Sequence, residues 1–157
     1  MEKIVIAKTV LSIMPRVDGV RRMIFERNNS LAIHSMNDAH GSLGTMERIL
    51  DNIWRLDELY DLKVVVLEYV DKMPAKLSQV IKLSFFKNQT SEQIAVQVGV
   101  SVRTVFRHLK DGVERFAAGL EKLGLDYVNF KKLIARNKWI NDEFQRQQFL
   151  VKQTSII

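Results

Sequence analysis

The sequence predicts an all-α protein, and three features support this. There are 7 glycines and 2 prolines among 157 residues, which favours long helices over a sheet with many tight turns. Apolar residues make up 46% of the chain, enough for a buried core. They recur every three or four residues in several segments, as on one face of a helix. We expect a helical N-terminal region at 1–72 that contains a long helix, a second helical domain at 73–124, and a C-terminal helix with a tail at 125–157.

The N-terminal region is predicted to begin with two helices. The first covers residues 2–13, although Ile4-Val5-Ile6 also fits the start of a strand. Pro15 suits the first turn of the next helix, because its missing N–H would have no partner there in any case. From His34 to Gly44, small and turn-forming residues interrupt the apolar pattern and predict a loop.

A long helix follows this loop, with Thr45 as its candidate N-cap. Its apolar positions, at near-helical spacing, are Met46, Ile49, Leu50, Ile53, Leu56, Tyr60, Val64, Leu67 and Val70. Such a stripe needs cover from neighbouring helices or from another copy of the chain. We therefore expect Thr45–Asp71 to support a homodimer.

The composition indicates where the protein works and which kinds of site it lacks. Without cysteine, the chain has no disulfide and no thiolate metal site. The N-terminus lacks a signal-peptide pattern, and the longest aliphatic run, Val64–Leu67, is far short of a membrane span. We expect a soluble, cytoplasmic protein. The predicted loop contains His34, Asp38 and His40, but two histidines in a loop are more often solvated surface than a metal site, so we expect no metal and no cofactor.

Charge is unevenly distributed along the chain. The net charge is +6, of which residues 1–73 contribute −1, residues 74–124 contribute +4 and residues 125–157 contribute +3. A basic half joined to a near-neutral half indicates that the basic half meets a polyanion. Ordinary solvated surface charge would give the same numbers.

Met73-Pro74 marks the start of the second domain, since proline disfavours helical geometry at the preceding residue and suits the first turn of a new helix. After Leu125, an apolar pattern predicts one more helix as far as Gln148, or two helices broken near Asn137. Residues 149–157 are expected to form a loosely held tail.

The strongest local pattern lies at 90–116 and predicts a helix-turn-helix. Thr90 and Gln93 fit a capping box at the start of its first helix. Gly99 lies where that helix must end, in a left-handed conformation that glycine adopts at little cost. Ser101 is a natural N-cap for the second helix.

The second helix of this motif has an apolar face and a basic face. Its apolar stripe continues to Leu123, where Gly124 is placed to end the helix. Arg103, Arg107 and Lys110 follow one another at intervals of four and three residues on the other side. A recognition helix offers such residues to the major groove, where arginine can bond guanine O6 and N7 together. The alternative is the solvated face of an ordinary amphipathic helix.

These residues resemble region four of bacterial sigma factors. The resemblance covers Lys72–Leu123 and rests on Met73-Pro74, Phe85-Phe86, Ile94-Ala95, Gly99-Val100-Ser101 and Thr104-Val105, in that order and spacing. The family has Leu-Pro and a Tyr-Phe-like pair at the first two of these places. The resemblance implies recognition of promoter-type duplex DNA and contact with RNA polymerase.

The resemblance also indicates which residues face the groove. By this likeness Phe106 is a groove-facing position, but it also lies on the apolar stripe, and we expect it in the core. Thr90 and Ser91 are expected to bind a phosphate at their helix start, and His108 to contact phosphate when protonated. The complete set of expected DNA-contacting residues is Thr90, Ser91, Ser101, Val102, Arg103, Thr104, Arg107, His108 and Lys110.

The 72 residues before Met73 lack the clustered aromatic pattern of the sigma region that melts DNA; their Trp and Tyr residues are Trp54, Tyr60 and Tyr69. The architecture is more similar to small sigma-like regulators of Gram-positive bacteria and their phages. A sequence-specific transcriptional regulator is therefore expected. The alternative is a protein-binding helix-turn-helix that docks on RNA polymerase or a sigma factor without touching DNA. We expect no enzyme, because the chain has no glycine-rich phosphate loop, no nucleophile elbow and no His-Glu-x-x-His motif.

Overall fold

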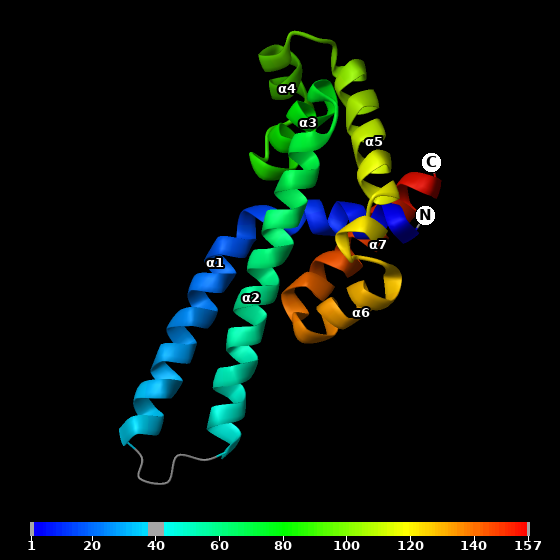
Figure 1. Cartoon of the computed structure of the whole chain (residues 1–157). Helices are drawn as coiled ribbons and strands as arrows, with labels where there is room; N and C mark the ends of the chain where they lie inside the picture. Colours follow the sequence, from blue (N-terminus) through cyan, green and yellow to red (C-terminus); the bar gives the residue numbers. More distant parts are fainter. Residues whose placement is uncertain (1, 38–42, 157) are drawn as a thin grey trace. The chain divides into compact units, whose positions relative to one another are not determined.

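The computed structural model describes residues 2–37 and 43–156, and all regular structure within these ranges is helical, as predicted. The elements in chain order are α1 (Glu2–Asn37), α2 (Leu43–Lys72), α3 (Ala75–Ile81), the π-helical turn η1 (Lys82–Phe86), α4 (Ser91–Val98), α5 (Val102–Ala118), the 3₁₀ turn η2 (Glu121–Leu123), α6 (Tyr127–Arg136) and α7 (Lys138–Ile156) (Figure 1). None of the helices in the described ranges is long and apolar enough to cross a bilayer.

The chain divides into two compact units. The core unit contains residues 1–15 together with 65–157, and the hairpin unit contains residues 16–64. These boundaries differ from those of the three segments expected from the sequence, so the assignment of separate roles to those segments stays a prediction.

Helix α1 is continuous through Pro15, so the prediction of two helices meeting there is wrong, and Ile4–Ile6 is helical rather than extended. A proline inside a helix removes a backbone hydrogen bond and costs about 3 kcal/mol. The three residues Val10, Leu11 and Ile13 before it are fully buried. Burial of each such side chain is worth about 1.5–3 kcal/mol, so tertiary packing outweighs the cost of the proline.

The loop between α1 and α2 is shorter than the predicted His34–Gly44. Helix α1 extends to Asn37 and α2 begins at Leu43, while residues 38–42 lie outside the described part of the chain. Thr45 is therefore not an N-cap; it lies in the first turn of α2. The long helix itself is confirmed and ends at Lys72, directly before Met73-Pro74.

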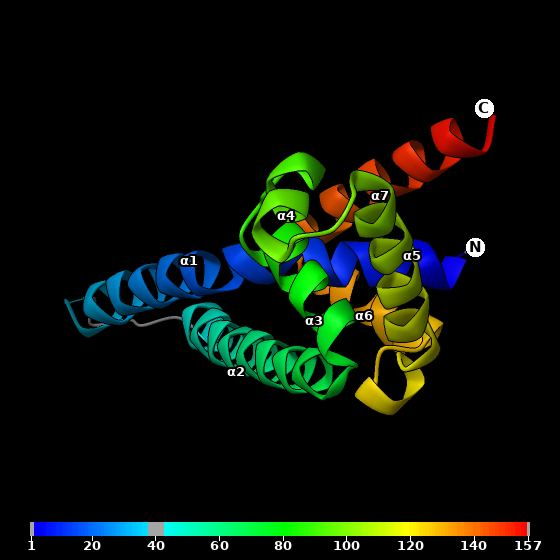
Figure 2. The same cartoon turned by 90° about the horizontal axis from the view of Figure 1, so that it is seen from above.

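In the hairpin unit, α1 and α2 lie side by side (Figures 1 and 2). Lys63 donates to both carboxylate oxygens of Asp18, at 2.8 and 2.6 Å. This hydrogen bond holds the pKa of Asp18 below its ordinary value of 3.8. Arg21 Nε donates to the carbonyl of Leu56 at 3.2 Å, and its guanidinium lies 5.0 Å from the centroid of the Tyr60 ring. These contacts fix the register of the two helices in this unit.

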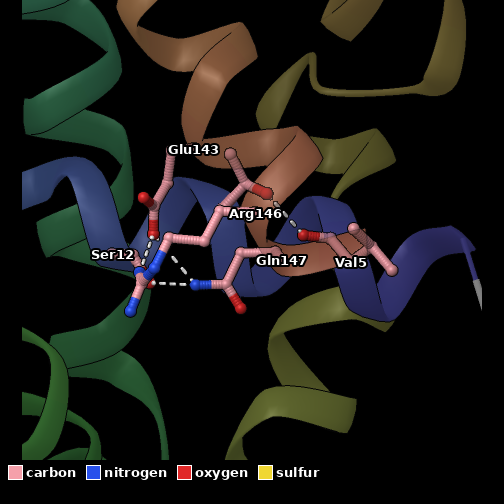
Figure 3. Close-up of polar contacts among 6 residues, drawn as sticks. Val5, Ser12, Glu143, Arg146 and Gln147 are labelled. Carbon is pink, nitrogen blue, oxygen red and sulfur yellow. Dashed lines mark hydrogen bonds and ion pairs between the residues drawn. The ribbon is translucent and has the colours of Figure 1, made fainter. Parts of the chain in front are cut away.

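In the core unit, the first turns of α1 pack on α7 through a partly buried polar cluster (Figure 3). Gln147 Nε2 donates to Ser12 Oγ at 3.3 Å and to Glu143 Oε1 at 2.9 Å. Arg146 Nη1 donates to the same Glu143 oxygen at 2.9 Å. Two helices from opposite ends of the chain are thus joined inside one unit.

The C-terminal segment forms two helices that meet at Asn137, which confirms the second of the two alternatives. Asn137 is buried, and its Nδ2 donates to the carbonyl of Leu133 at 3.0 Å. This bond gives a partner to one of the last carbonyl groups of α6, which have none within the helix. The tail expected at residues 149–157 is helical as far as Ile156, the end of α7, and its described side chains are exposed or half-buried. Phe130 of α6 packs against Phe144 of α7, with ring centroids 5.0 Å apart in an edge-to-face arrangement.

Candidate nucleic-acid interface

Helices α3, α4 and α5 gather around a small core of their own (Figure 1). Its buried members are Val80, Ile94, Ala95 and Val105, and Leu83, Val98, Val100, Val102 and Leu109 pack against them. Ala95 allows the two helices of the motif to approach closely because its side chain is small. The predicted helix-turn-helix is therefore present, and its core fixes which side of α5 is left outside.

The start of α4 carries the predicted capping box. Thr90 Oγ1 accepts from the Gln93 amide at 3.2 Å, and Gln93 Oε1 accepts from the Thr90 amide at 3.0 Å. In this cap the Thr90 hydroxyl oxygen accepts a hydrogen bond, so its O–H group is still able to donate to a group outside the protein. Thr90 is exposed and Ser91 is half-buried.

The turn between the two helices also follows the prediction. Gly99 ends α4 with φ 78° and ψ 36°, the left-handed conformation that favours glycine. Ser101 caps α5, where its Oγ accepts from the Thr104 amide at 3.1 Å. The hydroxyls of Ser101 and Thr104 also lie 2.9 Å apart and share a hydrogen bond. Both of these expected contact residues therefore have a structural role in starting the helix.

The outer side of α5 carries the three expected cations. Arg103, Arg107 and Lys110 are all exposed. Among the described residues, none of the three has an ion-pair or hydrogen-bond partner, whereas Lys82 on η1 is paired with Asp71. Exposed Glu114 follows Lys110 by one turn on the same side, so the cationic stretch covers the first half of the helix, where it suits phosphates and the acceptor edge of guanine.

Two other expected residues lie further inside. Val102 is half-buried and packs against the helix-turn-helix core. His108 is half-buried, and its Nδ1 is buried without a hydrogen-bond partner among the described residues.

The expectation that Phe106 belongs to the core is wrong, because 58% of its surface is exposed. The inward stripe of α5 passes through Val105, Leu109 and Val113, at intervals of four residues. Phe106 is one residue beyond Val105, a rotation of about 100° around the helix, which takes it out of that stripe. It lies beside the cations instead.

Phe106 lines a half-open pocket of about 520 Å³ inside the core unit. Its lining residues are Ile4, Lys8, Ser84, Phe85, Phe106, Leu109, Lys110, Val113, Glu114 and Thr154. Sequence reasoning missed the contributions of α1 and α7 here, namely Ile4, Lys8 and Thr154. No local signal marks them, since only tertiary packing brings the chain ends to α5.

Helix α5 ends earlier than predicted, at Ala118 rather than near Leu123. Gly119 is its C-cap, and a Cβ there would lie 2.2 Å from the Tyr69 hydroxyl oxygen. The predicted stop, Gly124, has φ 71° and ends the short turn η2.

The part of the chain that the structure describes contains no group of three or more His, Asp or Glu side chains able to hold a metal ion. His34 is exposed, while Asp38 and His40 of the proposed loop lie outside the described residues.

Comparison with known families assigns the segment just described. Residues 63–116 match the family model described as "Sigma-70, region 4". The helix-turn-helix is a sigma-70 region 4 domain. The match begins within α2 and ends at Phe116, so it contains the capping box, the turn and the basic side of α5. No curated protein and no solved structure matches the chain.

The region 4 match supports a DNA-binding helix-turn-helix that takes part in transcription. Region 4 domains bind DNA and RNA polymerase. The match leaves residues 1–62 and 117–157 without a family, and it gives no support for the homodimer expected from α2.

Proposed function

We propose that this chain is a sequence-specific DNA-binding regulator of transcription that inserts α5 into the major groove of promoter-type DNA. The observation that carries the proposal is that Arg103, Arg107 and Lys110 are exposed in a segment that matches sigma-70 region 4, without an ion-pair partner in the described part of the chain. From Arg103 to Lys110 the helix contains no carboxylate, and none of the three cations has an ion-pair partner among the described residues.

The positions of these residues along the motif favour base contacts for some of them and phosphate contacts for others. Arg103 and Arg107 are one turn apart near the start of α5, where a recognition helix reaches base edges. Lys110 follows one turn later and suits a phosphate as a point charge. The Thr90 hydroxyl, at the start of α4, is placed to donate to a phosphate of the same DNA strand or its complement.

A second candidate function has its own support. Phe106 is exposed next to a pocket whose wall includes Phe85, Leu109 and Val113. Apolar surface of this kind favours a protein partner, and RNA polymerase is the partner that region 4 domains share. In this reading the motif docks on polymerase or a sigma factor without touching DNA.

A salt series with two arginine variants separates the two functions. We expect Arg107→Ala to weaken binding to the specific duplex by about 1–3 kcal/mol and to lower the salt dependence of binding. The matched control is Arg115→Ala, which removes an exposed arginine from the last turn of the same helix. Fluorescence anisotropy with a labelled duplex, at several salt concentrations, measures both quantities.

Equal binding by Arg107→Ala and the unaltered protein would contradict the proposed recognition helix. Binding to polymerase that Phe106→Ala abolishes, together with no salt-dependent DNA binding, would favour the docking function instead.

The proposed role requires no covalent chemistry, and we propose that the chain is not an enzyme. It would act in the cytoplasm, where bacterial DNA is found. Small sigma-like regulators of Gram-positive bacteria and their phages remain the architectural model for this role.

A further inference from the structure

The hairpin unit exposes an unusual amount of apolar surface. Its exposed large apolar side chains are Met23, Phe25, Ile33, Leu43, Met46, Leu50, Ile53, Trp54 and Tyr60. Trp54 has 73% of its surface exposed. Single exposed apolar side chains are ordinary, but a concentration of them on one element marks an interaction surface.

Four of these side chains share one side of α2. Met46, Leu50, Ile53 and Tyr60 follow one another at intervals of four, three and seven residues, the repeat of a helix–helix contact. We call this set the outer stripe. It is distinct from the stripe that includes Leu56 and Leu59, whose members are half-buried and buried. Helix α2 therefore has one buried apolar stripe and a second one that is about half exposed; among the described residues, Arg21 of α1 lies over the Tyr60 ring at one end of this second stripe.

The exposed charges along this part of α2 are mostly acidic. Glu47, Asp51, Asp57 and Asp61 are exposed carboxylates, and Arg48 is the exposed cation between Leu43 and Val64 in the described structure. Asp57 continues the register of the outer stripe between Ile53 and Tyr60, and Asp61 follows it by one turn. Negative charge thus lies within the outer stripe at Asp57 and beside it at Asp61.

We propose that the outer stripe of α2 is a docking site for a basic amphipathic helix of another protein. Such a helix would place apolar residues at three- and four-residue spacing on Leu50 and Ile53, and lysine or arginine beside Asp57 and Asp61. A second copy of this chain is a poorer occupant, because pairing α2 with its own copy brings two acidic borders together. This site is independent of the DNA contact on α5.

Trp54 provides a natural reporter for the docking, since it follows Ile53 at the edge of the outer stripe. The Trp139→Phe variant of the full chain leaves Trp54 as its only tryptophan. The probe is a synthetic three-heptad peptide with leucine at the two apolar positions of each heptad and lysine on the flanking positions. A peptide with glutamate in place of every lysine is the control probe.

We expect the lysine peptide to shift Trp54 emission to shorter wavelength and the glutamate peptide to leave it unchanged. Leu50→Ala should weaken binding of the lysine peptide about tenfold. Ile33→Ala is the matched control, because it removes an exposed aliphatic side chain from α1 of the same hairpin and should leave binding unchanged.

Four results would overturn the proposal. They are absence of binding by the lysine peptide, equal binding of both peptides, protection of Trp54 from iodide quenching in the free monomer, and a dimer in sedimentation that Leu50→Ala dissociates. The last result would assign the stripe to a second copy of the chain.

Discussion

Gly119 ends α5 directly against the ring of Tyr69. A Cβ at this position would lie 2.2 Å from the Tyr69 Oη atom and 2.4 Å from its Cζ atom. The ring cannot move freely, because it packs edge-to-face on buried Phe116, at 5.6 Å between centroids, and its hydroxyl donates to the Arg115 carbonyl at 3.2 Å. This glycine is required by close approach and not by its backbone angles.

We predict that Gly119→Ala lowers the free energy of unfolding by about 1–3 kcal/mol, since the added methyl must displace the Tyr69 ring. Gly19→Ala is the control, because no atom lies within 4 Å of its new Cβ and the residue is inside α1. That variant should be more stable by about 0.5–1 kcal/mol. Urea unfolding followed by circular dichroism measures both, and equal effects of the two substitutions would contradict the assigned contact.

At the same scale, Phe106 shows where sequence reasoning reached its limit. The cap at Thr90, the left-handed Gly99 and the cap at Ser101 depend on neighbouring backbone, and all three were predictable. Phe106 directly follows Val105, and the spacing of the apolar residues in the sequence assigns both to the inward apolar stripe of α5. Which of two adjacent residues faces inward depends on where α3 and α4 lie, and this information is not local.

At the scale of elements, the hairpin unit depends in part on one ion pair. Lys63 lowers the pKa of Asp18, so the folded state favours the charged carboxylate. A group with a lowered pKa adds stability that is fully present above its unfolded pKa and is lost as the pH falls through its folded pKa. The contribution is therefore constant above about pH 4 and disappears on further acidification.

We predict that Lys63→Gln lowers the stability at neutral pH by about 0.2–1 kcal/mol, the range for an exposed pair, because the Asp18 carboxylate is 60% exposed. Below the ordinary pKa of 3.8, the difference between the variant and the unaltered protein should shrink. Unfolding curves at a series of pH values test this. A difference that grows on acidification would have the wrong sign for the assigned pair.

The elements that the sequence predicted best are those with their own end signals. The break near Asn137 and the boundary at Met73-Pro74 are both present. At Pro15 the prediction was wrong because tertiary burial outweighs the cost of the proline, whereas the last turns of α7 are mostly exposed and simply continue a helix that is anchored one turn earlier. Buried Leu11 and Ile13 hold the helix through the proline, and the bonds of Gln147 attach α7 to α1.

At the scale of the whole molecule, the charge asymmetry was visible in the sequence and corresponds to two different surfaces. The core unit carries the exposed cations of α5, which have no ion-pair partner among the described residues, and the hairpin unit carries the apolar outer stripe of α2 with carboxylates beside it. The pocket beside Phe106 was not predictable, because its walls come from α1, η1, α5 and α7. Residues so far apart in the chain share no local pattern.

Selection of bound duplexes from a random-sequence library tests the central claim most directly. The account predicts that the full chain enriches a defined sequence motif, and that Arg103→Ala or Arg107→Ala loses the preference at particular base pairs while retaining weak, salt-sensitive binding. Arg115→Ala should select the same motif as the unaltered protein. A library that shows no enrichment, or a motif that survives both substitutions on the outer side of α5, would contradict the account.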